Sequence, residues 1–294
     1  MTEKSIVILT GNERRHQFAR MALAMVPGLN VLVSICEGND GNVSELVGRR
    51  AGPGCEQELQ FLEERRLTEE DAFSHFCASV PDNSNPRWVR RNEVNSQKIR
   101  SLIANDLKPD LILAYGCSII KEPLLSSFQR RFLNLHLGLS PYYRGAGTNF
   151  WPLVNNEPEY VGATFMHLDS GIDTGEIIHQ IRSRIHLNDT PHQIGNRLLM
   201  DAIFAYGAIA RCLERIEIMD QPKCANGKYY RKEDYNSRSI DIISRAFRKG
   251  MVRDYLNNRY ERDRKVEIVT NKIVLEELSI LGLSRSDLLK LLKQ

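Results

Sequence analysis

Three side chains in the middle of the sequence have the chemistry that acyl transfer requires. Asn134 and His136 are separated by one residue at the end of a short apolar run. A carboxamide can donate hydrogen bonds to a developing oxyanion, and an imidazole can stabilise that charge or exchange a proton near neutral pH. Asp173 lies in the turn Gly171–Gly175, from which a carboxylate could fix the tautomer of the imidazole. These three residues are the candidate catalytic group. An Asn-x-His pair at a strand end that stands alone more often has a structural role.

The predicted position of Asn134 and His136 favours a site. Residues i and i+2 of a strand share a face, so both side chains point the same way from the carboxyl end of the strand at 131–136. Open α/β sheets place their ligand sites at that end. The following loop contains Gly138, Pro141 and Gly145, and its irregular composition can wrap a site but cannot form a core.

The elements around these residues predict an α/β fold. The chain opens with a β-α-β pattern, which predicts parallel strands and right-handed crossovers. Thr190 and Pro191 predict the N-cap and first position of a long helix. The expected architecture is Rossmann-like, a mostly parallel sheet with flanking helices. Strands are predicted at residues 5–10, 30–35, 111–115, 131–136, 161–168 and 176–185, and further helices at 13–25, 56–80 and 93–107.

The amino-acid composition of the chain changes near residue 220. We therefore predict a catalytic domain at residues 1–218 and a small, mostly helical region at 219–294. Residues 223–265 carry 13 Lys and Arg against 6 Asp and Glu, which favours either a solvated surface or a phosphate-binding one. Two short amphipathic helices are expected around Gly282. Their apolar face could pair two subunits into a homodimer or close the core, and it contains Leu275, Leu278, Leu281 and Leu288.

Composition excludes several classes of protein. The 294 residues carry a net charge of +3, too mild to indicate a nucleic-acid-binding protein by itself. No window approaches the roughly 18 consecutive apolar residues of a membrane span, and no signal-peptide pattern is present, so we expect a cytoplasmic protein. The six cysteines form no C-x-x-C pair and have no His at zinc-ligand spacing. They are expected to be reduced thiols, and no metal site is expected.

Three ordered motifs resemble the formyl transferase family. They are Asn134-Leu-His136, the loop Ser140-Pro-Tyr-Tyr-Arg-Gly-Ala146, and the turn Gly171-Ile-Asp-Thr-Gly175. The strand and loop Leu113–Ile120 are also similar to those with which the family holds the pterin of folate through backbone groups. The resemblance covers roughly residues 98–182, with a weaker β-α-β match before it.

The resemblance implies a folate-dependent N-formyltransferase. The donor would be 10-formyltetrahydrofolate, and a primary amine would attack the formyl carbon directly, without an acylated enzyme. Asn134 and His136 would bind the oxyanion, while Asp173 would orient His136 and help to remove the amine proton. The implied folate-binding residues are Tyr115, Gly116, Cys117, Ile119, Asp169 and Gly171.

The acceptor is expected to be a nucleotide-linked amino sugar. The loop after His136 and the segment Gly227–Tyr235 look more like members that act on such sugars. The tail lacks the strand-rich barrel of the tRNA-directed members, which makes nucleic acid an unlikely partner. A diphosphate needs N–H donors and cations, although Arg14 and Arg15 could equally form a solvated helix face. The expected substrate-binding residues are Gly11, Asn12, Arg14, Arg15, Tyr143, Arg144 and Gly145.

Other functions remain as alternatives. They are a methionyl-tRNA formyltransferase, a hydrolase that releases formate from the same folate, and a non-catalytic module that binds folate or a nucleotide. A dinucleotide oxidoreductase is disfavoured, because the first turn, Thr10-Gly-Asn-Glu-Arg-Arg15, lacks the G-x-G-x-x-G pattern.

Overall fold

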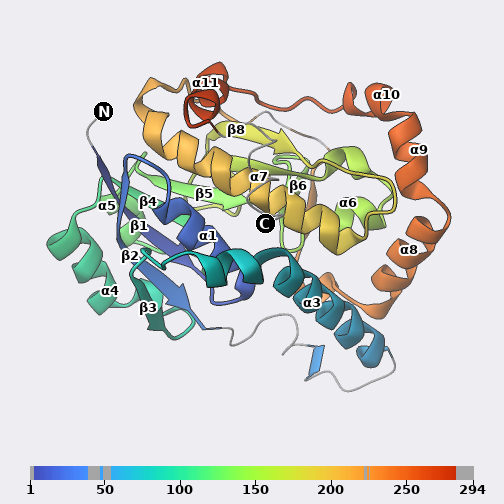
Figure 1. Cartoon of the computed structure of the whole chain (residues 1–294), viewed down its shortest axis with the longest axis horizontal. Coiled ribbons are helices and arrows are strands. Elements are labelled where there is room, and N and C mark those ends of the chain that lie inside the picture. Colours follow the sequence, from blue (N-terminus) through green and yellow to red (C-terminus); the bar gives the residue numbers. More distant parts are fainter. Residues whose placement is uncertain (1–2, 39–46, 49–53, 222–223, 225, 283–294) are drawn as a thin grey trace.

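A seven-stranded sheet forms the centre of the protein in the computed structural model, which describes residues 3–38, 47–48, 54–221, 224 and 226–282 (Figure 1). Its strand order is β3-β2-β1-β4-β5-β7-β8. The first five strands of this order pair in parallel, whereas β7 pairs antiparallel with both of its neighbours, β5 and β8. The mostly parallel, Rossmann-like sheet is therefore confirmed. The strands are β1 (Lys4–Thr10), β2 (Leu29–Glu37), β3 (Pro86–Val89), β4 (Leu111–Tyr115), β5 (Phe132–His136), β7 (Gly162–His167) and β8 (Ile177–Arg182).

Both faces of the sheet are covered, as apolar residues on both faces of β1 require. Ile6 and Ile8 point into the larger core, which they share with α1 (Arg14–Ala24), α3 (Cys55–Ser79) and α7 (Pro191–Cys212). Val7 and Leu9 alternate with them and point into a second core on the opposite face. That core is closed by α4 (Gln97–Ser101), the π-helical segment Leu102–Leu107 and α5 (Leu124–Ser127).

The long helix α7 begins where the sequence predicts. The Thr190 hydroxyl accepts a hydrogen bond from the backbone N–H of Gln193 at 3.2 Å, and Pro191 occupies the first helical turn. Further along α7, the fully buried Tyr206 reaches the sheet. Its hydroxyl donates to the Leu133 carbonyl at 2.8 Å and accepts from the Ala114 N–H at 3.0 Å. Tyr206 thus connects β4 to β5, the strand that carries the candidate catalytic residues.

Some elements differ from the prediction. The helix expected at 93–107 is divided, because the Ser96 hydroxyl caps a new helix by accepting from the Ile99 N–H. Two strands of three residues, β6 (Tyr143–Gly145) and β9 (Lys228–Tyr230), form a separate parallel pair. Segments this short carry no alternating pattern. Other unpredicted short elements are α6 (Trp151–Val154) and the 3-10 turns Glu93–Asn95, Pro158–Tyr160, Leu213–Arg215 and Lys232–Asp234.

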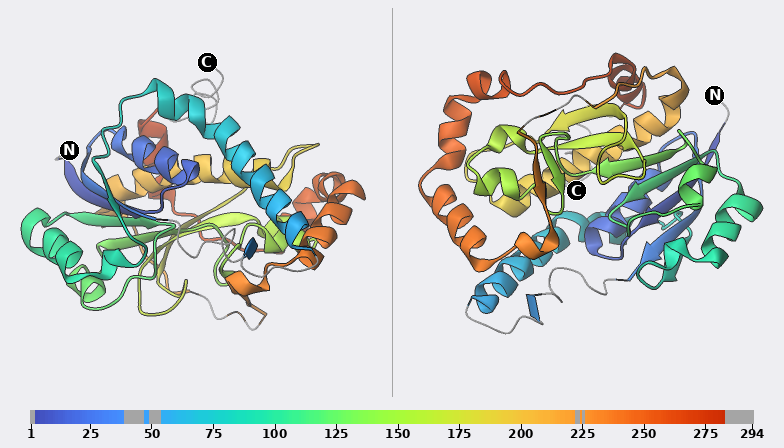
Figure 2. Two further views of the ribbon diagram at one scale, coloured as in Figure 1. Left: turned by 90° about the horizontal axis from the view of Figure 1, so that it is seen from below. Right: turned by 180° about the vertical axis from the view of Figure 1, so that it is seen from behind.

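After α7 the chain runs along the edge of the molecule and returns to lie beside α7 (Figures 1 and 2). This region is mainly helical, as predicted. Its last described helix is held by Glu277, which is fully buried and pairs with Arg211 at 2.7 Å and Arg215 at 2.5 Å. Its helices are α8 (Ser237–Arg248), α9 (Met251–Asn257), α10 (Arg259–Asp263) and α11 (Lys272–Ile280).

The apolar face proposed for α11 is partly covered. Leu278 and Leu281 pack against the main core, whereas Leu275 is 48% exposed. Leu288, and the second helix expected after Gly282, lie outside the described residues. Among the helices that the structure describes, none has the length and apolar character needed to cross a membrane.

The hydroxyl of Tyr206 provides a test of how α7 is anchored to the sheet. We expect Tyr206→Phe to lower the free energy of unfolding by about 1–3 kcal/mol, because the buried Ala114 N–H loses a partner. Urea denaturation would measure this loss. Tyr260→Phe is the matched control, since Tyr260 is 75% exposed, and it should leave stability unchanged. Equal stabilities of the two variants would contradict the anchoring role.

Candidate active site

Asn134 and His136 lie on one face of β5, at its carboxyl end, as expected from their spacing. The intervening Leu135 points into the larger core instead. Asn134, His136 and Asp173 all line one cavity of about 750 Å³. The structure therefore brings the three predicted catalytic side chains together, although Asp173 is 37 residues away from His136 in the sequence.

His136 is held between two hydrogen-bond acceptors. Its Nδ1 lies 3.3 Å from Oδ1 of Asp173, and its Nε2 lies 3.1 Å from the carbonyl oxygen of Tyr143. The side chains of His136 and Asp173 are only 7% and 12% exposed. Since a carbonyl and a carboxylate can only accept, both contacts are satisfied when both ring nitrogens carry hydrogen. The two acceptors therefore hold the ring of His136 from both sides.

Asn134 differs from its neighbour in having an uncommitted side chain. It is half-buried, borders the cavity, and makes no side-chain hydrogen bond to any other residue that the structure describes. Its amide N–H groups can therefore donate to a ligand without breaking an internal contact. This is the property that an oxyanion-binding residue needs.

The turn that carries Asp173 is compact. Asp173 itself adopts a left-handed backbone with φ of +54°, which is uncommon for a residue with a side chain. Its second carboxylate oxygen accepts a hydrogen bond from the Gly145 N–H at 2.9 Å. A Cβ on Gly175 would lie 1.8 Å from the carbonyl oxygen of His167, so only glycine allows the turn to close against β7.

All the residues predicted to bind folate line the cavity, namely Tyr115, Gly116, Cys117, Ile119, Asp169 and Gly171. Ile119 and Ile172 are 65% and 42% exposed beside it. Apolar side chains exposed at a cavity suit a flat ring system, so this wall fits a pterin.

Burial raises the pKa of the Cys117 thiol to about 12, so it is not a nucleophile at neutral pH. No three metal-ligating side chains gather among the residues described.

The residues predicted to bind the acceptor are only partly brought to the cavity. Arg15 and Gly145 line it. The others do not appear in its described lining, and these are Gly11, Asn12, Arg14, Tyr143 and Arg144.

The arginines of the first turn are engaged by carboxylates. Arg14 pairs with Glu70 at 2.8 Å, and Arg15 pairs with Glu69 at 2.7 Å. Both side chains stay partly exposed, so a phosphate would meet guanidinium groups that already pair with carboxylates. Gly11 has a packing role, because a Cβ there would lie 2.7 Å from the ring of His16.

Several residues of the cavity were not predicted. His16 borders it from α1, Phe61 and Glu69 from α3, and His192 and Asn196 from α7. A pattern of apolar spacing identifies which helix face is buried but not which polar residue on it borders a cavity.

Cations from two distant segments also border the cavity. Arg91 follows β3, while Arg231 and Lys232 follow β9. Burial, followed by the positive charge of Arg91, lowers the pKa of Lys232, which indicates that the two cations lie near each other. Two sequence signals pointed to this side of the cavity: the basic composition of residues 223–265, and the resemblance of the segment Gly227–Tyr235 to members of a known family.

A family model described as formyl transferase matches residues 54–206, just over half of the chain. A methionyl-tRNA formyltransferase of Synechococcus sp. (strain WH7803) is 27% identical over 66% of this chain and 59% of its own length. Another, of Desulforamulus reducens, is 36% identical over 33% of this chain and 30% of its own length. The chain thus matches less than two thirds of these relatives.

Solved structures share the fold at low identity. A sugar N-formyltransferase from Shewanella sp FDAARGOS_354 superposes with a TM-score of 0.52 at 15% identity, over 79% of this chain and 78% of that one. A 4-N formyltransferase from Francisella tularensis gives 0.51 at 17% identity, over 79% and 78%. The segment matched by the family model contains Asn134, His136 and Asp173. This chain belongs to the formyl transferase family.

Proposed function

We propose that this protein transfers a formyl group from 10-formyltetrahydrofolate to the primary amine of a nucleotide-linked amino sugar. The observation that carries this proposal is the buried contact of His136 with Asp173, beside the uncommitted amide of Asn134, on the wall of one cavity. An amide, an imidazole and a carboxylate can supply an oxyanion site and a proton acceptor, and transfer to an amine needs both.

Different residues of the chain have different roles in the proposed reaction. When bound, 10-formyltetrahydrofolate would supply the formyl carbon, and the wall formed by residues 115–119 and Ile172 would hold its ring. The Asn134 amide donates to the formyl oxygen as negative charge develops there. His136 opposes the same charge, and its Nε2–H is shared with the Tyr143 carbonyl that holds it in this structure. The Asp173 carboxylate orients the imidazole and would help to accept the proton that the attacking amine loses, and this proton would pass to the folate nitrogen as its bond to the formyl carbon breaks.

A phosphate-bearing acceptor is supported by the cations at the cavity. Arg91 and Lys232 border it from different segments, and closely placed cations favour an anionic ligand. Two structures with the same fold are a sugar N-formyltransferase and a 4-N formyltransferase, each matching 79% of this chain.

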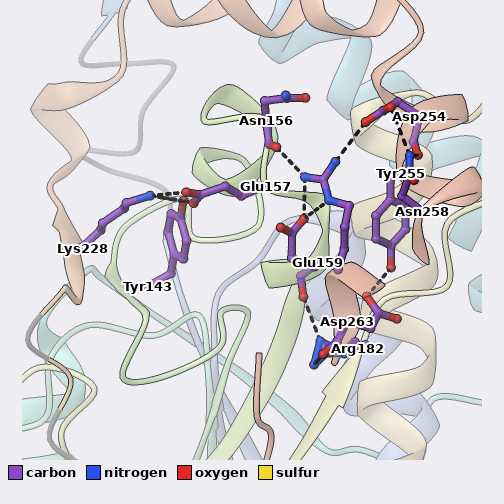
Figure 3. Close-up of polar contacts among 11 residues, drawn as sticks. Tyr143, Asn156, Glu157, Glu159, Arg182, Lys228, Asp254, Tyr255, Asn258 and Asp263 are labelled. Carbon is purple, nitrogen blue, oxygen red and sulfur yellow. Dashed lines mark hydrogen bonds and ion pairs between the residues drawn. The ribbon is translucent and has the colours of Figure 1, made fainter. Parts of the chain in front are cut away.

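Methionyl-tRNA is the second candidate acceptor, because the relatives found by sequence are methionyl-tRNA formyltransferases. A tRNA would need unpaired cations on the C-terminal region. Several of its basic residues instead pair with carboxylates: Lys228 with Glu157, Arg262 with Glu159, Arg259 with Asp263, and Arg264 with Glu261 (the Glu157 and Glu159 contacts are in Figure 3). We favour the amino sugar because the cations Arg91 and Lys232 border the cavity itself.

Substitution of the catalytic residues tests the reaction. We expect Asn134→Ala, His136→Ala and Asp173→Asn each to lower kcat by about 10²–10⁴, while the affinity for folate changes little. Tetrahydrofolate release would be followed by absorbance with nucleotide-linked amino sugars, with methionyl-tRNA and without an acceptor. His75→Ala is the matched control, because His75 is exposed on α3. Full activity of His136→Ala would refute the assigned mechanism, and release without an acceptor would indicate a hydrolase.

Substitution of Arg91 tests the nature of the acceptor. Loss of a charge-assisted hydrogen bond should raise KM for a nucleotide-linked acceptor about tenfold in Arg91→Ala, with kcat nearly unchanged. The neighbouring Arg90 is exposed and does not appear in the cavity lining, so Arg90→Ala is the control. A rise in KM for folate alone would show that Arg91 faces the carboxylates of the donor instead.

A further inference from the structure

The small sheet of β6 and β9 touches both members of the catalytic pair. In β6, the Tyr143 carbonyl lies 3.1 Å from Nε2 of His136, and the Gly145 N–H donates to Asp173 at 2.9 Å. The backbone of one three-residue strand thus fixes the imidazole on one side and the carboxylate on the other. Any shift of β6 would change both contacts together.

β6 is held in place by β9, which lies beyond the segment matched by the family model. The Lys228 N–H donates to the Tyr142 carbonyl at 2.7 Å, and the Ala146 N–H donates to the Tyr230 carbonyl at 2.8 Å. The close approach depends on Gly145, because a Cβ there would lie 2.1 Å from the Tyr230 carbonyl oxygen.

A polar cluster holds the side chain of Tyr143 in β6, and its contacts with Glu157 and Lys228 are drawn in Figure 3. The Tyr143 ring is buried, and its hydroxyl donates to Glu157 and accepts from Asn155 at 2.8 Å. Lys228 completes the cluster, with Nζ 2.6 Å from Glu157 and 3.1 Å from the Tyr143 hydroxyl. The side chains therefore reinforce the backbone pairing of β6 with β9.

Gln221 also contacts the turn that carries Asp173, through its side-chain amide. Its Nε2 lies 2.9 Å from the carbonyl oxygen of Asp173 and 2.9 Å from that of Gly175. One amide group therefore donates to two carbonyls of a turn whose central residue has an uncommon left-handed backbone. Leaving the amide or either carbonyl unpaired in this half-buried position would lower the stability of the folded protein.

We propose that Gln221 is a positioning residue for the His136–Asp173 pair, acting with β9 as a clamp supplied by the C-terminal region. Gln221 keeps the backbone of the Asp173 turn in place, and β9 keeps the β6 backbone against both side chains. Without the two donated hydrogen bonds the turn loosens, and the Asp173 carboxylate moves relative to the imidazole. The effect on catalysis rests on the proposed function, but the effect on the imidazole does not.

The test uses the full chain with Gln221→Met, which keeps the side-chain length and removes both donors. We expect kcat for the amino-sugar acceptor to fall about ten- to a hundredfold, because small displacements of catalytic groups have effects of that size. KM for the acceptor should stay within about twofold, because Gln221 does not appear in the described lining of the cavity. KM for folate should rise with the loosened turn, because Gly171 and Ile172 belong to that turn and border the cavity. Gln129→Met is the control, because Gln129 is exposed and outside the cavity lining.

A spectroscopic readout separates this proposal from the proposed function. The ¹⁵N resonances of the His136 ring report its hydrogen bonds without any turnover, and we expect them to shift in Gln221→Met but not in Gln129→Met. Gln221→Glu is the second variant: its carboxylate would face two carbonyls, so its kcat relative to the wild type should rise as pH falls and the carboxyl gains a proton. Unchanged His136 resonances in both Gln221 variants would overturn the positioning role, whether or not the chain transfers formyl groups.

Discussion

The contact on which the site depends is the buried pairing of His136 with Asp173, in which the second ring nitrogen also faces an acceptor. A histidine ring and a carboxylate lose hydration when they are buried, and only well-placed partners offset that loss. Here β5 carries His136, a separate turn carries Asp173, and β6 supplies the Tyr143 carbonyl and the Gly145 N–H. The sheet alone therefore cannot build the site, and the loops that follow its strands must be fixed as well.

This requirement explains where glycine occurs around the site. Gly175 lets the Asp173 turn close against β7, and Gly145 lets β9 approach β6. Each position brings two backbones closer than a Cβ would allow. The Pro-Tyr-Tyr-Arg-Gly loop thus helps to position His136 and Asp173, because its backbone groups contact both side chains. Its side chains Tyr143 and Arg144 do not appear in the described lining of the cavity, whereas its Gly145 does.

The parts that could be predicted from the sequence are those with a local signal. The apolar run of β1 and the cap at Thr190 predicted a strand of the sheet and the start of α7, and three spaced motifs singled out Asn134, His136 and Asp173 as the candidate catalytic group. The pairing of β6 with β9 has no such signal, since each strand has three residues and their partners are more than 80 residues apart. Gln221 and the ion pairs of Arg14 and Arg15 also depend on tertiary contacts. A polar side chain gives no indication in the sequence of which distant group it meets.

In the proposed function, binding of the acceptor would be connected to the positions of the proposed catalytic groups. Tyr230 lines the cavity, while its carbonyl holds Ala146 next to β6 and its ring stacks on Trp151 at 4.2 Å. Lys232, two residues later, borders the same cavity. A ligand that contacts this segment therefore acts on the strand that holds β6 against His136 and Asp173. Binding energy from a remote part of the acceptor can in this way be used to order the catalytic pair, which would make turnover, as well as affinity, depend on that remote part.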